Sequence, residues 1–66
     1  MLIKLNGADF EAPDGSSVSD LLRIKGVEPA HAVVEYNMVI LKIEELDTIR
    51  LKMGDVVEVL RFVGGG

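Results

Sequence analysis

PDGSSVSDLLRIKG, residues 13–26, is the stretch in which strand-breaking residues give way to a helical pattern. Ser17 is a favourable N-cap residue, and Asp20 three positions later completes the signature of a helix start. An apolar stripe follows at helical spacing: Val18, Leu21 and Leu22. Gly26 is placed to end the helix in the left-handed conformation. The stretch therefore predicts one short helix, about residues 18–25.

The preceding segment, residues 1–12, has the alternating pattern of strands and reads MLIKLNGADFEA. Apolar Met1, Ile3 and Leu5 alternate with polar Lys4 and Asn6. The dipeptide Asn6-Gly7 then favours a tight two-residue turn. We predict a β-hairpin over residues 1–12.

Two segments after the helix are dense in β-branched and apolar residues, HAVVEYN (31–37) and MVILK (38–42). They predict a second antiparallel pair, one strand of which is a candidate for a central position buried on both faces. Met38 stands where a two-residue hairpin turn would prefer glycine.

The next segment, IEELDTIRL (43–51), fits a short 3₁₀ or α turn. Its apolar residues Ile43, Leu46 and Ile49 fit either one helical turn or a loop in which they are inward anchors, and we assign the turn. The following KMGD (52–55) is predicted to be a turn.

A last strand is predicted at VVEVLRFV, residues 56–63. Because strand residues alternate between faces, Val57 and Val59 share one face. The other face carries Val56, Leu60 and Phe62.

The predicted order is therefore β-β-α-β-β-turn-β. It indicates an α+β protein of the β-grasp, or ubiquitin-like, class, with a mixed four- to five-stranded sheet crossed by one helix. We assign residues 1–63 to this domain and residues 64–66 to a flexible C-terminal glycine tail. One helix covers only one face of such a sheet, so the other face is either polar or a docking surface.

Length and charge exclude several classes of protein. The 66 residues fit one domain and contain no cysteine, hence neither disulfides nor thiolate chemistry. A net charge of −4 argues against nucleic acid or an anionic membrane as partner. The sequence starts without a signal-peptide pattern and has no run of membrane-spanning length, so we expect a cytoplasmic protein.

Residues 1–63 offer no convincing catalytic or metal-binding motif. His31 is the only histidine, and without cysteine it has no partner for a typical zinc site. Glu44 and Glu45 are adjacent, so their side chains diverge and need not share a site. We expect no catalytic residue, no metal and no cofactor bound by this chain.

Three consecutive glycines, Gly64, Gly65 and Gly66, close the sequence. They add no side chain to a core and lose much entropy when ordered, so stability does not explain them. Fully extended they reach about 10 Å, enough to carry the Gly66 carboxylate into a narrow cleft of another protein. A carboxylate becomes an acyl donor when a partner that holds ATP converts it to an acyl-adenylate. A persulfide would then give a thiocarboxylate, and an amine would give an amide-linked conjugate.

The whole chain resembles the ThiS family, small β-grasp sulfur carriers of thiamin biosynthesis that end in Gly-Gly. The resemblance is carried by four segments: LNG (5–7), VSDLL (18–22), VVEYN (33–37) and, most specifically, GDVVEVLRFVGGG (54–66). The sequence departs from many relatives at Asn37-Met38-Val39, where they have Asn-Gly-Glu, and at Lys42-Ile43, where a Pro-Arg pair would fall. Contacts that partners make with those residues are therefore not carried over.

The resemblance implies a carrier that is not itself an enzyme. A ThiF- or MoeB-like adenylyltransferase would use ATP and magnesium to adenylate Gly66, with Gly65 in the narrow part of its channel. The resulting thiocarboxylate would supply sulfur to a ThiG-like thiazole synthase. Alternatives are a sulfur carrier for molybdopterin synthesis, a ubiquitin-like protein modifier, and an interaction module with an inert tail.

A partner-binding patch is expected just before the tail, at Leu60, Phe62 and Val63. Leu60 and Phe62 lie on the strand face that the helix need not cover. The alternative is that both are core residues of the last strand.

Overall fold

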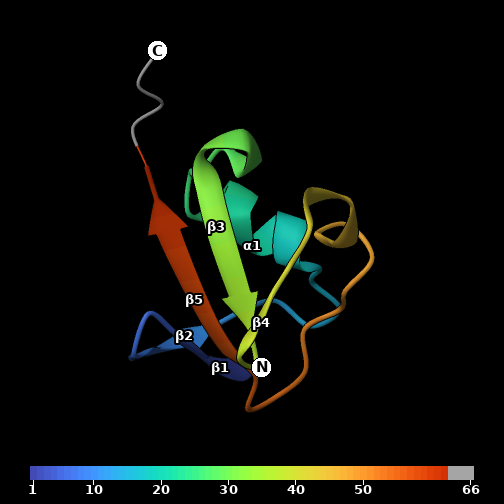
Figure 1. Cartoon of the computed structure of the whole chain (residues 1–66). Helices are drawn as coiled ribbons and strands as arrows, with labels where there is room; N and C mark the ends of the chain where they lie inside the picture. Colours follow the sequence, from blue (N-terminus) through green and yellow to red (C-terminus); the bar gives the residue numbers. More distant parts are fainter. Residues whose placement is uncertain (63–66) are drawn as a thin grey trace.

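The computed structural model describes residues 1–62, which form a five-stranded sheet packed on one helix (Figure 1). The elements, in chain order, are β1 (Leu2–Leu5), β2 (Ala8–Glu11), α1 (Val18–Ile24), the 3₁₀ helix η1 (Pro29–His31), β3 (Ala32–Tyr36), β4 (Val39–Ile40), the 3₁₀ helix η2 (Ile43–Glu45) and β5 (Val56–Arg61). Val63, expected to end the last strand, and the predicted tail, residues 64–66, lie outside the described residues.

The sheet has the strand order β2-β1-β5-β3-β4, with β5 at its centre. β1 and β5 run parallel, while β1–β2, β3–β5 and β3–β4 are antiparallel. Figure 1 shows α1 lying across one face of this sheet. The arrangement confirms the predicted α+β β-grasp fold, with five strands rather than four.

Local sequence signals determine the turn between β1 and β2 and the two ends of α1, as predicted. Asn6 and Gly7 both have positive φ, 51° and 82°, and so form the tight turn between β1 and β2. At the start of α1, the Ser17 hydroxyl accepts the Asp20 N–H, and the Asp20 carboxylate accepts the Ser17 N–H, both at 3.0 Å. Gly26 follows the helix with φ of 69°.

The core lies between α1 and the covered face of the sheet. Its most deeply buried side chains are Ile3, Val18, Leu21, Leu22 and Val57, each at most 1% exposed. Fully burying one leucine or isoleucine contributes about 1.5–3 kcal/mol, so these few residues supply much of the stability of so short a chain.

The β3–β4 hairpin is confirmed, including its unusual turn. Asn37 and Met38 have φ of 47° and 72°, the positive values that a type I′ turn requires at both central residues. The central strand is β5 rather than β3, and neither is buried on both faces, because α1 covers only one face of the sheet. Val34 is 2% exposed against the core, whereas Val33 on the other face is 39% exposed.

The predicted turn after β4 is confirmed as the 3₁₀ helix η2, and two of the three apolar residues of this segment reach the core. Leu46 is buried and Ile49 is half-buried against the core. Ile43 is 61% exposed, because it begins the 3₁₀ helix on its outer side.

Candidate functional site

The sheet face opposite α1 carries an unusual number of exposed apolar side chains. We call this surface the open face and define it by seven residues: Leu2, Val33, Glu35, Ile40, Val56, Glu58 and Leu60. Register places them on one side, since Leu60 lies opposite Val33 and Ile40 lies opposite Glu35. An exposed apolar patch rimmed by polar groups commonly marks an interaction surface.

Leu60 and Phe62, two residues of the predicted patch, are both exposed. Leu60 is 69% and Phe62 49% exposed, and Leu60 belongs to the open face, so the alternative that it is a core residue is wrong. Val57 and Val59 point the other way, as the alternation predicted: Val57 is buried and Val59 packs against the core. The third residue of the patch, Val63, lies outside the described residues.

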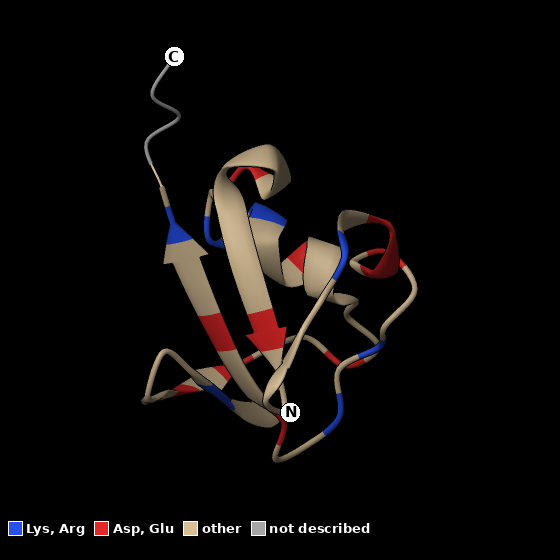
Figure 2. Ribbon diagram, viewed as in Figure 1, with Lys and Arg blue, Asp and Glu red and all other residues tan. Residues whose placement is uncertain are grey.

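Two glutamates occupy the middle of the open face. Glu35 on β3 and Glu58 on β5 are directly opposite each other in the register, and Figure 2 shows the acidic segments of the two strands side by side. Like charges in this position destabilise a sheet. Together with Val33, Ile40 and Leu60 they line a shallow hollow of about 180 Å³. The hollow thus combines apolar walls with negative charge.

His31 lies beside the predicted patch and has a structural role there. Its carbonyl accepts the Phe62 N–H at 3.0 Å, which continues the chain pairing beyond the end of β5. The His31 and Phe62 rings meet edge to face with centroids 6.4 Å apart. Within residues 1–62, no group of three or more histidine, aspartate or glutamate side chains could hold a metal ion.

A buried carboxylate that the sequence analysis missed, Asp55, joins the open face to the β3–β4 turn. Asp55 is only 6% exposed. Its carboxylate accepts hydrogen bonds from the Tyr36 hydroxyl at 2.7 Å and from the Lys52 N–H at 2.8 Å. The Asn37 side-chain amide donates to it at 3.2 Å, and the Asn37 side-chain oxygen accepts the Val56 N–H at 2.8 Å. This network fixes the turn against the start of β5.

Burial and hydrogen bonding oppose each other in setting the pKa of Asp55 but act together on the pKa of Tyr36. Burial alone would raise the pKa of Asp55, but hydrogen bonds from the Lys52 backbone, Tyr36 and Asn37 outweigh it and hold that pKa below its ordinary value. Burial, with the hydrogen bond to Asp55, raises the pKa of Tyr36 to about 12. Asp55 is therefore charged and Tyr36 neutral at physiological pH.

The remaining predicted site residues, Gly64, Gly65 and Gly66, lie outside the described residues. The last described positions are Arg61, which ends β5 near η1, and Phe62, which follows it (Figure 1). Among residues 1–62, no helix is long and apolar enough to cross a membrane.

A five-stranded β-grasp domain whose C-terminal strand forms part of an exposed apolar face is typical of small ubiquitin-like proteins. Within that class the chain belongs to the ThiS family, whose sequence model matches residues 3–66. It is 35% identical over 66 residues to the sulfur carrier protein ThiS of Bacillus subtilis, covering 98% of this chain and 100% of that one.

Solved structures agree with the family. The crystal structure of the thiamine biosynthesis protein ThiS from Geobacter metallireducens matches with a TM-score of 0.82 and 33% identity over 100% of both chains. The solution structure of a thiamine biosynthesis protein from the same organism matches with a TM-score of 0.81 and 33% identity, covering 100% of this chain and 88% of that one.

Proposed function

We propose that this protein is a sulfur carrier of thiamin biosynthesis that works through the carboxylate of Gly66. The observation that carries the proposal is the family match, which runs through residues 3–66 and so includes all three closing glycines. The Bacillus subtilis relative, which is named a sulfur carrier protein, is matched over its full length. The β-grasp domain then serves to present the tail.

The chemistry follows from the poor reactivity of a free carboxylate. A ThiF- or MoeB-like adenylyltransferase uses ATP and magnesium to join AMP to Gly66 and releases pyrophosphate. A sulfur donor then displaces AMP: hydrosulfide gives the thiocarboxylate of Gly66 directly, whereas a persulfide gives an acyl disulfide that a thiol reduces to the thiocarboxylate. A ThiG-like thiazole synthase takes the sulfur from this group.

In this proposal the chain is a carrier in the cytoplasm and not an enzyme, since ATP, magnesium and every bond-making step belong to its partners. The chain contributes the Gly66 acyl group and the surface by which partners recognise it. Gly64 and Gly65 carry no Cβ and fit a channel too narrow for other residues.

The open face, with Phe62 just after it in the chain, is the surface that we assign to those partners, and Val63 is proposed to contribute to the same contact. Leu60 and Phe62 are large apolar side chains exposed next to the tail, as a contact surface near the reacting group requires. The paired charges of Glu35 and Glu58 favour a partner that places an arginine or lysine among apolar groups.

Substitution Leu60→Ala is expected to weaken binding of the adenylyltransferase about tenfold or more, because it removes a large exposed apolar side chain of the open face. Ile24→Ala is the matched control, since Ile24 is 51% exposed but lies on α1, away from the open face. Calorimetric titration measures both affinities, and thermal melts check that both variants fold. Equal losses for the two variants, or no loss for Leu60→Ala, would contradict the assignment.

The pathway is tested by genetic rescue. The gene for this chain is expected to restore growth without thiamin to a bacterium that lacks its own thiamin sulfur carrier, and to leave a molybdenum-cofactor mutant unrescued. The opposite pattern would favour the molybdopterin carrier. Accumulation of the chain on lysines of other proteins would instead identify a modifier.

A further inference from the structure

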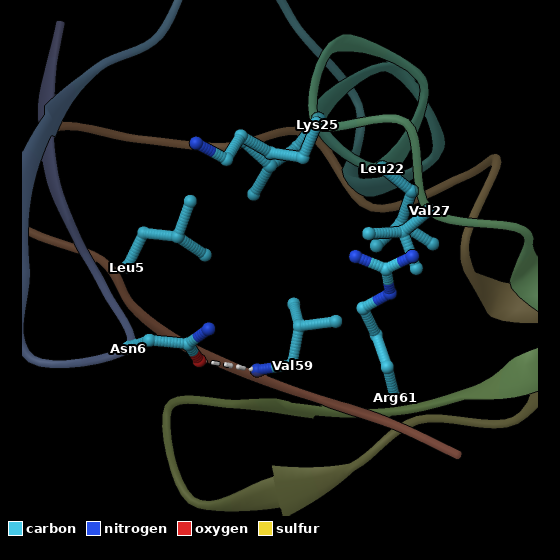
Figure 3. Close-up of a pocket in the computed structure, with 8 residues that line it drawn as sticks. Leu5, Asn6, Leu22, Lys25, Val27, Val59 and Arg61 are labelled. Atoms are coloured by element: carbon cyan, nitrogen blue, oxygen red, sulfur yellow. Dashed lines mark hydrogen bonds between the residues drawn. The ribbon is translucent and has the colours of Figure 1, made fainter. Parts of the chain in front are cut away.

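A partly open cavity of about 140 Å³ lies on the covered side of the sheet, between the C-terminal end of α1 and strands β1 and β5 (Figure 3). Its walls are apolar side chains: Leu5, Leu21, Leu22, Val27 and Val59. All but Val59 are among the buried residues of the core. The cavity is thus an opening into the core, on the opposite side of β5 from the open face.

Three nitrogen-bearing side chains surround this apolar cavity: Asn6, Lys25 and Arg61. The Asn6 side-chain oxygen is occupied, because it accepts the Val59 N–H at 2.7 Å. Figure 3 shows the Asn6 amide nitrogen on the cavity side of that bond, with the side chains of Lys25, just after α1, and Arg61, on β5, at different sides of the cavity. The cavity is therefore lined by hydrogen-bond donors and by no free acceptor side chain.

Of the seven lysine and arginine side chains, only Lys4 and Arg23 form ion pairs with residues 1–62, and the two cations at the cavity are among the other five. Lys4 pairs with Asp9 at 2.7 Å and Arg23 with Asp20 at 2.9 Å. Among residues 1–62, neither Lys25 nor Arg61 forms an ion pair, and the Lys25 ammonium instead lies 5.2 Å from the centre of the Phe10 ring. Two cations without an ion pair to any of residues 1–62 therefore line one cavity, which favours an anion there although the chain has a net charge of −4.

We propose that this cavity binds a small anion that carries one apolar ring, such as an aromatic carboxylate. A cavity of about 150 Å³ with apolar walls is large enough for a benzene ring. The ring would lie against the leucine and valine walls, and the carboxylate would accept hydrogen bonds from Lys25, Arg61 and the Asn6 amide. Such a ligand contacts the covered side of β5, so the site is independent of the tail and of the open face.

Titration of the ¹⁵N-labelled full chain with benzoate tests the proposal. We expect saturable shifts of the amide resonances of residues that line the cavity: Asn6, Lys25, Val27, Val59 and Arg61. Benzyl alcohol, which keeps the ring without the charge, and acetate, which keeps the charge without the ring, are each expected to bind at least tenfold more weakly.

A charge-matched pair of double variants locates the site. Lys25→Gln with Arg61→Gln is expected to weaken benzoate binding at least tenfold, whereas Lys4→Gln with Arg23→Gln removes the same charge elsewhere and is expected to change it less than twofold. All four positions are exposed, so both double variants are expected to fold. The proposal is overturned if benzoate causes no saturable shifts at the cavity, if the two double variants bind equally, or if either uncharged or ringless probe binds as tightly as benzoate. The assay involves no sulfur transfer, so its failure would leave the carrier function untouched.

Discussion

Deletion of Gly65 and Gly66 is expected to abolish sulfur incorporation completely while the domain stays folded. The deletion removes the carboxylate that the proposed adenylation uses, so no acyl-adenylate can form at the correct position. The buried core contains no residue beyond Val57 among those described, so stability has little reason to change. The measurements are sulfur incorporation with a ThiF-like adenylyltransferase, ATP, magnesium and a sulfur donor, and the melting temperature.

The control for this deletion is Met53→Ala, a substitution of a 78% exposed residue in the turn before β5. It is expected to keep both activity and melting temperature. A truncated chain that still gains sulfur would refute the assignment of Gly66. A fall in melting temperature of more than about 5 °C, equivalent to roughly 1 kcal/mol for a domain of this size, would show that the glycines support the core.

Substitution Asp55→Asn is expected to lower the free energy of unfolding by about 2–4 kcal/mol. The carboxylate of Asp55 accepts hydrogen bonds from three donors: the Tyr36 hydroxyl, the Asn37 side-chain amide and the Lys52 N–H. An asparagine side chain has no negative charge, and one of its two polar atoms is an NH₂ donor. At least one of the buried donors therefore loses its acceptor. For a domain of this size the melting temperature would fall by about 10–20 °C. Chemical denaturation of both proteins at neutral pH measures the difference.

The control is Asp9→Asn, which breaks only the exposed ion pair with Lys4 and is expected to cost less than about 1 kcal/mol. The pH dependence gives a second check. Because the folded-state pKa of Asp55 lies below the ordinary 3.8, its contribution is fully present above pH 3.8 and is lost as the pH falls through the folded-state pKa. The stability gap between wild type and Asp55→Asn should therefore stay constant near neutrality and narrow only below pH 3.8. A gap that narrows above that pH would contradict the hydrogen-bonded carboxylate.

The elements that sequence predicted well are those that depend on near neighbours. The Asn6-Gly7 turn needs only two residues that tolerate positive φ. The start of α1 needs only Ser17 and Asp20, whose capping bonds span three residues. Each of these signals depends on residues at most three positions apart, so the tertiary packing of distant segments does not change the local structure that they predict.

The points that the sequence left open concern burial, which depends on distant elements. Ile43 has the spacing of an inward anchor, yet η2 turns it outward while Leu46 reaches the core. β3 is as apolar as a central strand, but β5 takes the central position by pairing with β1 and β3. A pattern within one segment cannot tell which strand the final pairing places in the middle.

The candidate site was predictable in part. Alternation placed Leu60 and Phe62 together, but only the position of α1 decides that their face is the open one. Asp55 was missed because two of its donors, Tyr36 and Asn37, lie 19 and 18 residues away in the chain. The position of Glu35 opposite Glu58 likewise depends on the β3–β5 register, which cannot be derived from the sequence alone.

The central claim is that Gly66 carries sulfur, and the mass of the intact chain tests it most directly. After incubation with a ThiF-like adenylyltransferase, ATP, magnesium and a sulfur donor, the mass is expected to rise by one sulfur-for-oxygen exchange, located by fragmentation to Gly66. An unchanged mass, under conditions in which ATP-dependent adenylation of the chain is detected separately, would contradict the account.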